Sequence, residues 1–267
     1  MPDLVTLLGE FAARTQRART TLQASFGLKY GPTVHERLDV FPGEPGGPVV
    51  VFVHGGYWRS LAAEDFSCVA TGLTAAGATV VITNYALCPT VTIDEIVRQH
   101  RAAIAWTYHH IASFGGDRRR IAVVGHSAGG HGAAMMLLTR WAHNYALPAD
   151  VIKGVCAISG LFDLRPLVYT SVQTQLRLTA DTVLANSPLL MPPGAAPPLL
   201  ITYGTLQTDE FIRQSVDFHA AWEGAGLPSA AWKRRDRNHY DELLALTEPG
   251  ADLIAPILAL TEGRLHI

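Results

Sequence analysis

A serine between two glycines, placed where an apolar run meets a helical pattern, is the feature that most constrains this chain. Residues 121–124 (Ile-Ala-Val-Val) are apolar and mostly β-branched, as in a strand buried on both faces. Gly-His-Ser-Ala-Gly follows at 125–129, and residues 130–138 then have the composition of a helix. A strand, a G-x-S-x-G motif and a helix in this order are typical of a nucleophile elbow, which exposes the hydroxyl of its serine, here Ser127. The alternative is a glycine-rich turn in which Ser127 only caps the helix.

Apolar strand patterns alternate with helical patterns along the whole chain. We expect strands over 34–41, 49–53, 79–83, 121–124, 151–159, 198–203 and 230–233, and helices over 3–24, 62–76, 92–114, 130–138, 211–224 and 254–260. The alternation predicts one α/β domain over residues 1–267, with a mainly parallel sheet that carries helices on both faces. The proline-rich segment 163–197 is irregular, and we expect it to cover the active site at the carboxyl edge of the sheet.

The composition favours a cytoplasmic protein with one large core. Hydrophobic residues make up 48% of the 267 residues, and the formal net charge of −2 gives no reason to expect nucleic acid or a membrane as partner. Three arginines interrupt the apolar residues of the first 22 positions, so we expect no secretory signal or membrane span there. Cys68, Cys88 and Cys156 lie in or beside apolar segments and are expected to be buried free thiols. The sequence leaves open whether the protein forms a homodimer.

The base that a catalytic serine needs is expected late in the chain. A serine hydroxyl is a weak nucleophile until a neighbouring base takes its proton. In proteins with a nucleophile elbow on an α/β sheet, the chain order is serine, acid, histidine. His239 follows the last predicted strand, in the loop 237–241, and is the expected base. A histidine in an ordinary surface loop is the alternative.

The loop after the second predicted strand has the sequence His-Gly-Gly-Tyr-Trp at 54–58. In this position a loop of the HGG type supplies backbone N–H groups that stabilise a developing oxyanion. We expect the donors of this oxyanion hole on Gly55, Gly56, Tyr57 and Ala128. A simple glycine turn is the alternative.

Aromatic side chains near the predicted strand ends are candidates for a substrate-binding wall. These residues are Tyr57, Trp58, Tyr85 and Phe162. Ordinary packing is the alternative for each of them. The sequence contains no H-E-x-x-H, P-loop or dinucleotide-binding motif, and His126 and His131 beside the serine have no carboxylate or cysteine at ligand spacing. We therefore expect no metal and no cofactor, since acyl transfer through serine needs neither.

Four segments together resemble the kynurenine formamidases of the α/β-hydrolase superfamily. They are His54-Gly-Gly-Tyr-Trp58, Gly125-His-Ser-Ala-Gly-Gly-His131, Ser159-Gly-Leu-Phe-Asp-Leu-Arg-Pro-Leu167 and Glu210-Phe-Ile-Arg-Gln-Ser215, in the order of that family. The first and third are more specific than G-x-S-x-G, which a great many hydrolases share. The resemblance implies an α/β-hydrolase fold and the hydrolysis of N-formyl-L-kynurenine, or a similar aryl formamide, to formate and the free arylamine.

The acid of the catalytic triad is the one position that departs from the family's pattern. In proteins of this kind it lies three residues after the glycine that ends the preceding strand, and counting from Gly204 this residue is Gln207. Asp209 and Glu210 are the nearest carboxylates. Three interpretations compete: Asp209 reaches His239 from a shifted loop, Gln207 orients His239 through its uncharged amide oxygen, or the acid is absent and the enzyme is weak.

Two further functions stay open at this point. A carboxylesterase, or a hydrolase of another small amide or carbamate, would use the same serine and histidine, because the pocket rather than the fold decides the substrate. A non-catalytic binding protein with a hydrolase fold is the other alternative, and Gln207 is its only support.

Overall fold

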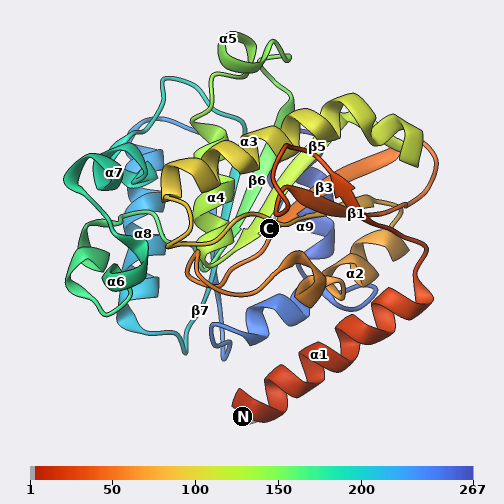
Figure 1. The fold of residues 1–267 in the computed structure, drawn as a ribbon, viewed down its shortest axis with the longest axis horizontal. Helices are drawn as coiled ribbons and strands as arrows, with labels where there is room; N and C mark the ends of the chain where they lie inside the picture. The colour runs from red at the N-terminus through yellow and green to blue at the C-terminus, as the bar shows by residue number, and fades with distance from the viewer. Residues whose placement is uncertain (1–3, 267) are drawn as a thin grey trace.

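The sheet at the centre of the protein is mainly parallel, as predicted (Figure 1). The computed structural model describes residues 4–266, in which eight strands pair in the order β1-β2-β4-β3-β5-β6-β7-β8. The strands are β1 (Ser25–Lys29), β2 (Arg37–Phe41), β3 (Gly47–Val53), β4 (Thr79–Thr83), β5 (Gly116–His126), β6 (Ile152–Ile158), β7 (Leu199–Gly204) and β8 (Ser229–Arg234). β2 is antiparallel to β1 and β4, whereas every pair from β4 to β8 is parallel.

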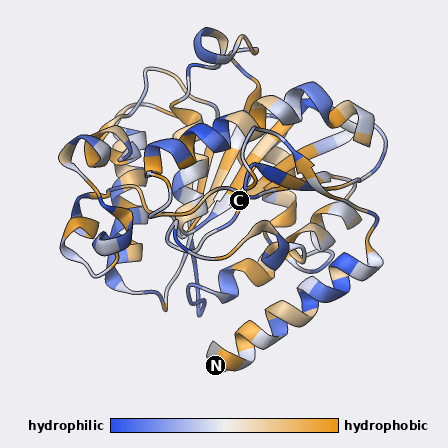
Figure 2. Ribbon diagram, in the orientation of Figure 1, coloured by the Kyte–Doolittle hydropathy of each residue, from blue (hydrophilic) through white to orange (hydrophobic). Residues whose placement is uncertain are grey.

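Helices cover both faces of the sheet, so its central strands are buried on both sides (Figure 2). The period of two in a strand sends alternate residues of β3 into different cores: Val51 packs with one, Val50 and Phe52 with the other. One face packs against α3 (Ile93–His110), α4 (Ala128–Leu137) and α8 (Asp209–Gly224). The other face packs against α1 (Leu4–Thr21), α2 (Val69–Ala75) and α9 (Ile254–Leu260).

The main elements agree with the predicted ranges to within a few residues, but short elements differ. β1 was not predicted, because this edge strand is only half-buried and lacks a clear alternation. The helix expected over 62–76 is divided into η1 (Ala63–Phe66) and α2. Residue 3, where the first predicted helix begins, lies outside the described residues. The remaining short elements are η2 (Ile111–Phe114), α5 (Trp141–Tyr145), η3 (Arg165–Tyr169), α6 (Gln173–Leu176), α7 (Ala180–Ala185), η4 (Pro188–Leu190) and η5 (Asp241–Leu246).

The three cysteines are buried and free, as predicted: Cys68, Cys88 and Cys156. Within residues 4–266, none of the helices combines the length and the apolar character needed to cross a membrane.

Four histidine side chains are almost completely buried: His54, His100, His126 and His131. Burial disfavours the charged imidazolium and lowers the pKa of three of them, His54, His126 and His131, to about 4. The pKa of His100 is also well below its ordinary value, first because of burial and then because His131 and His54 lie nearby. The folded protein therefore holds these rings in the neutral form.

The buried neutral histidines predict a loss of stability in acid. The unfolded chain binds a proton at His54, His126 and His131 near pH 6.5, whereas the folded chain does so only near pH 4. Their contribution to stability is therefore fully present above pH 6.5 and is lost as the pH falls toward 4. We expect each to lower the free energy of unfolding by about 2 kcal/mol between pH 7 and pH 5, measured by urea denaturation.

A pair of variants isolates this effect. His100→Leu removes one buried imidazole whose ring nitrogens both lack a hydrogen-bond partner among the described residues, and it is expected to make the loss in acid smaller. His109→Gln changes an exposed histidine and is expected to leave the loss unchanged. The same pH dependence in both variants and the wild type would contradict the prediction.

Candidate active site

Ser127 occupies a strained turn between β5 and α4, where the sequence predicts a nucleophile elbow. Its φ of 58° and ψ of −121° lie outside the regions that a non-glycine residue ordinarily adopts. The flanking glycines permit the turn, because a Cβ on Gly125 would lie 2.0 Å from the carbonyl oxygen of Gly129. A Cβ on Gly129 would lie 2.0 Å from the carbonyl oxygen of Val53. The two glycines therefore let the turn pack directly against β3.

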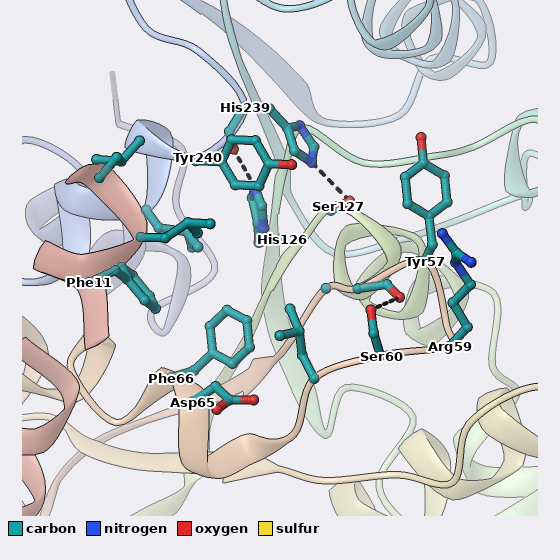
Figure 3. A pocket seen from close by; sticks show the side chains of 16 residues that line it. Phe11, Tyr57, Arg59, Ser60, Asp65, Phe66, His126, Ser127, His239 and Tyr240 are labelled. Atoms are coloured by element: carbon teal, nitrogen blue, oxygen red, sulfur yellow. Dashed lines mark hydrogen bonds between the residues drawn. The ribbon is translucent and has the colours of Figure 1, made fainter. Parts of the chain in front are cut away.

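The structure brings together the two residues that the sequence predicts as nucleophile and base. The Nε2 of His239 lies 3.0 Å from the Oγ of Ser127 (Figure 3). His126 donates a hydrogen bond from Nε2 to the backbone carbonyl of His239, at 2.7 Å. The ring of Phe211 on α8 packs against the imidazole of His239, with centroids 4.2 Å apart. These contacts hold the imidazole toward the serine.

The loop that carries His239 is fixed by a buried ion pair at the end of β8. Arg234 is 3% exposed and donates hydrogen bonds to the carboxylates of Glu242, at 2.9 Å, and Asp252, at 2.5 Å. Burial raises the pKa of Glu242 to about 7, although Arg234 acts in the opposite direction. Because Arg234 ends β8 and its guanidinium binds Glu242 on the far side of the loop, the two ends of the loop are held together.

The imidazole of His239 is kept neutral by its surroundings. Burial, and next the proximity of His126, lower the pKa of His239 to about 2. A neutral imidazole whose Nε2 faces Ser127 has the protonation state that a general base requires. Its Nδ1 is buried and has no hydrogen-bond partner among residues 4–266.

Among residues 4–266, no carboxylate is hydrogen-bonded to the imidazole of His239. Asp209 is the first residue of α8 and its side chain is exposed, so the expectation that it reaches His239 from a shifted loop is not met. Glu210 pairs with Arg213 at 2.7 Å instead. Gln207 is the buried residue of this turn, and its Nε2 donates to the Oγ of Ser159 at 2.5 Å. The Oε1 of Gln207 has no partner in the part of the chain that the structure describes.

The loop 54–58, called here the oxyanion loop, lies directly against the serine. A Cβ on Gly55 would lie 3.0 Å from the Cβ of Ser127. Gly56 has a φ of 114° and Tyr57 a φ of 50°, so the loop is held in an unusual backbone conformation. Among the described residues, none accepts a hydrogen bond from the backbone N–H of Gly55, Gly56, Tyr57 or Ala128. These groups therefore remain free to stabilise an oxyanion.

Three of the predicted wall residues, Trp58, Tyr85 and Phe162, lie in the core and not in the cavity. Trp58 packs edge-on against His131, at 5.1 Å between centroids. Phe162 stacks on Phe218 of α8 at 4.2 Å. The prediction was wrong for these three because proximity to a strand end does not decide which side of the backbone a side chain takes. Tyr57 does line the cavity.

Tyr85 holds the oxyanion loop in place through contacts with His54. Its ring stacks on that of His54 at 4.2 Å, and its hydroxyl donates to the backbone carbonyl of His54 at 2.8 Å. On the other side, the Oγ of Ser60 donates to the carbonyl of Gly56 at 2.9 Å. Tyr85 is thus a positioning residue for the loop that was expected to supply the oxyanion hole.

A cavity of about 320 Å³ opens beside Ser127 (Figure 3). His126, His239 and the oxyanion loop line one part of it, and the helix α1 lines another through Leu7, Leu8 and Phe11. None of the residues 163–197 lines this cavity. Contrary to the prediction, this segment therefore does not form a wall of the cavity at Ser127. That segment instead contacts Arg59 at the rim, whose Nη1 donates to the Oε1 of Gln175 at 3.1 Å.

Sequence reasoning misses His126, Phe211 and the α1 residues of the site. The spacing of Leu7 and Phe11 indicates an amphipathic helix but not which surface that helix covers. His126 occupies the first variable position of the G-x-S-x-G motif, and the motif assigns no role to this residue. The hydrogen bond from His126 to the carbonyl of His239 is therefore seen only in the structure.

Known proteins similar to this chain include hydrolases. A family model named BD-FAE matches residues 41–221. The kynurenine formamidase of Danio rerio is 31% identical over 242 residues, which are 88% of this chain and 80% of that protein, and the one of Salmo salar is 32% identical over 88% and 81%. A crystal structure from Silicibacter sp. TM1040, described as a candidate thioesterase, has a TM-score of 0.83 and 31% identity over 96% of this chain and 94% of that one.

Tyr85→Phe tests the support of the oxyanion loop. The variant leaves the buried carbonyl of His54 without its donor, which costs about 1–3 kcal/mol of stability. Because the loop loses its fixed position, we expect kcat for 4-nitrophenyl acetate to fall by about 10-fold with KM little changed. Tyr30→Phe is the matched control, since the Tyr30 hydroxyl also donates to a backbone carbonyl, that of Asn84, at 2.6 Å. Equal effects of both variants on kcat would refute this role of Tyr85.

Proposed function

Because the chain belongs to the kynurenine formamidase family of α/β-hydrolases, we propose that it hydrolyses N-formyl-L-kynurenine or a similar aryl formamide to formate and the free arylamine. The protein is a hydrolase, as its relatives are. The observation that carries the proposal is the 3.0 Å contact between Ser127 and the neutral base His239 beside a mostly apolar cavity.

The geometry supports catalysis by a formyl-enzyme. His239 takes the proton of Ser127 as Oγ attacks the formyl carbon, and the carbonyl oxygen becomes an oxyanion. The free N–H groups of Gly56, Tyr57 and Ala128 stabilise this charge. The protonated His239 then gives its proton to the leaving arylamine nitrogen as the C–N bond breaks. Water, deprotonated by His239, attacks the formyl ester. As the bond to Oγ breaks, His239 returns this proton to Ser127, and the released formic acid ionises to formate.

We place Gln207 in the role that the acid has in related enzymes. Residues 204–207 run beside the His239 loop, since the N–H of Leu206 donates to the carbonyl of Arg237 at 2.9 Å. The bond from its Nε2 to Ser159 fixes the amide of Gln207 and leaves Oε1 as the free acceptor. The Nδ1 of His239 is the free buried donor of the same region. An uncharged acceptor that takes a hydrogen bond from Nδ1 would orient the ring and would raise the pKa of His239 less than a carboxylate does.

An ester is the alternative substrate, because the same residues cleave both bonds and an ester releases its alcohol more easily than a formamide releases an amine. The absence of a carboxylate at His239 in the described chain favours the easier reaction.

We also propose a cytoplasmic location, since three free thiols fit a reducing compartment.

The first experiment compares kcat/KM for N-formyl-L-kynurenine and for 4-nitrophenyl acetate. We expect cleavage of the formamide, with release of formate, and a loss of at least about 10³-fold for both substrates in Ser127→Ala. Labelling of Ser127 by a fluorophosphonate tests the nucleophile without a substrate. Ester cleavage without formamide cleavage would contradict the proposal, and a protein with neither activity nor labelling would be a binding protein.

Gln207→Glu is expected to increase activity. A carboxylate at this position stabilises the imidazolium of His239, so the pKa of His239 rises and the acid limb of the kcat/KM profile moves to higher pH. At pH 8 we expect a gain of about 10-fold or more in kcat. Gln207→Met, which has no acceptor, is expected to lower kcat instead. If neither variant changes the profile or kcat, Gln207 does not act on His239.

A further inference from the structure

The helix α1 forms an apolar wall of the cavity that contains Ser127. Leu7 and Phe11 lie one helical turn apart on the face that packs on the body, and both line the cavity together with Leu8 (Figure 3). Phe11 meets Phe66 of η1 edge-on, at 5.7 Å between ring centroids. Leu243 of η5, which follows His239, completes this part of the cavity. Side chains from three distant segments of the chain thus enclose one apolar chamber.

Large apolar side chains are exposed at the rim of this chamber. Leu8 and Leu61 are each 49% exposed and Tyr240 is 44% exposed, and all three line the cavity. Exposed apolar side chains that are gathered around a cavity mark a ligand-binding surface more often than isolated ones do. Their position indicates that an apolar group of the ligand passes them.

The charged side chains that line the cavity are already paired with protein groups. Asp65 accepts a hydrogen bond from the backbone N–H of Ala62 at 2.9 Å, and Arg59 donates to Gln175 at 3.1 Å. The chamber between α1 and Phe66 therefore offers apolar contacts to a ligand rather than a charge.

Polar contacts keep α1 in place against the body. Arg14 donates to the hydroxyl of Thr247 at 2.9 Å, and Thr15 donates to the carbonyl of Asp65 at 3.0 Å. Further along the helix, Arg19 pairs with Asp39 at 3.1 Å. Because these contacts fix the helix, its apolar wall exists before a ligand binds, and a ligand loses little binding energy in ordering it.

We propose that α1, Phe66 and Leu243 form an aryl subsite that binds an uncharged aromatic ring of the substrate and that Leu8 controls its entrance. The inference rests on the proposed function in one respect: a formyl group is small, so the aromatic leaving group is the part of the substrate that fills the chamber. The subsite selects substrates by the size and polarity of the group attached to the scissile bond.

Inhibition by two boronic acids tests the subsite without a substrate. Phenylboronic acid and methylboronic acid both form a tetrahedral adduct with the Oγ of an active serine. Their organic group is attached to boron, where a formamide carries only hydrogen, and the cavity beside Ser127 offers the chamber as the apolar space into which this group can turn. In the wild type, we expect the phenyl compound to bind at least about 10-fold more tightly, equivalent to about 1.4 kcal/mol. Inhibition is measured against hydrolysis of 4-nitrophenyl acetate.

Leu8→Asp and Val5→Asp are the matched variants. Both place a carboxylate on α1, but Val5 is 80% exposed and does not line the cavity. We expect Leu8→Asp to raise the inhibition constant of phenylboronic acid by about 10-fold or more, with that of methylboronic acid changed by less than about 2-fold. Val5→Asp is expected to change neither. Leu8→Asn repeats the test without a charge and should change the phenyl constant in the same direction.

The outcomes separate the subsite from the proposed function. Equal phenyl-to-methyl ratios in the wild type, Leu8→Asp and Val5→Asp would overturn the subsite, whatever the activity on formamides. A lost phenyl preference in Leu8→Asp, in a protein that cleaves esters but not N-formyl-L-kynurenine, would support the subsite and reject the formamidase function. An equal loss for both boronic acids would mean that Leu8 acts on Ser127 and not on an aryl group.

Discussion

The close parallel pairing of β3 and β5 is the constraint on which the whole site depends. Val53, the last residue of β3, is paired with Gly125 of β5, so the loops that follow the two strands leave the sheet side by side. Only glycine fits at 125 and 129, because a side chain at either position would overlap a backbone carbonyl. The close packing of the two backbones therefore places Ser127 beside the oxyanion loop, and no side-chain contact is needed for this.

The base is positioned by the backbone and by ring packing rather than by charge. His126 donates to the carbonyl of His239, Phe211 packs on its ring, and Arg234 at the end of β8 binds Glu242 after the loop. Burial lowers the pKa of His239 to about 2, so the imidazole of the resting enzyme is neutral at neutral pH. The arrangement favours proton removal from Ser127 and gives little stabilisation to the imidazolium that forms next.

The sequence predicts the parts of the molecule that depend on local pattern. β3, β4 and β5 are runs of β-branched residues, and the elbow is a contiguous motif, so both the sheet and the Ser127–His239 pair could be anticipated from the chain. The substrate wall could not, since whether Trp58 or Tyr57 faces the cavity depends on backbone angles in a strained loop. The position of α1 depends on contacts with residues more than 200 positions away.

The attachment of α1 has a consequence for the order in which the protein assembles. The contacts of α1 with Asp39 and Asp65 span 20 and 50 residues, whereas Arg14 bonds to Thr247, 233 residues further along the chain. Contacts of such large sequence separation carry a high loop-closure entropy and form late. In a chain with a finished sheet but without the contact between Arg14 and Thr247, Ser127 and the oxyanion loop would be in position before α1 had all of its attachments.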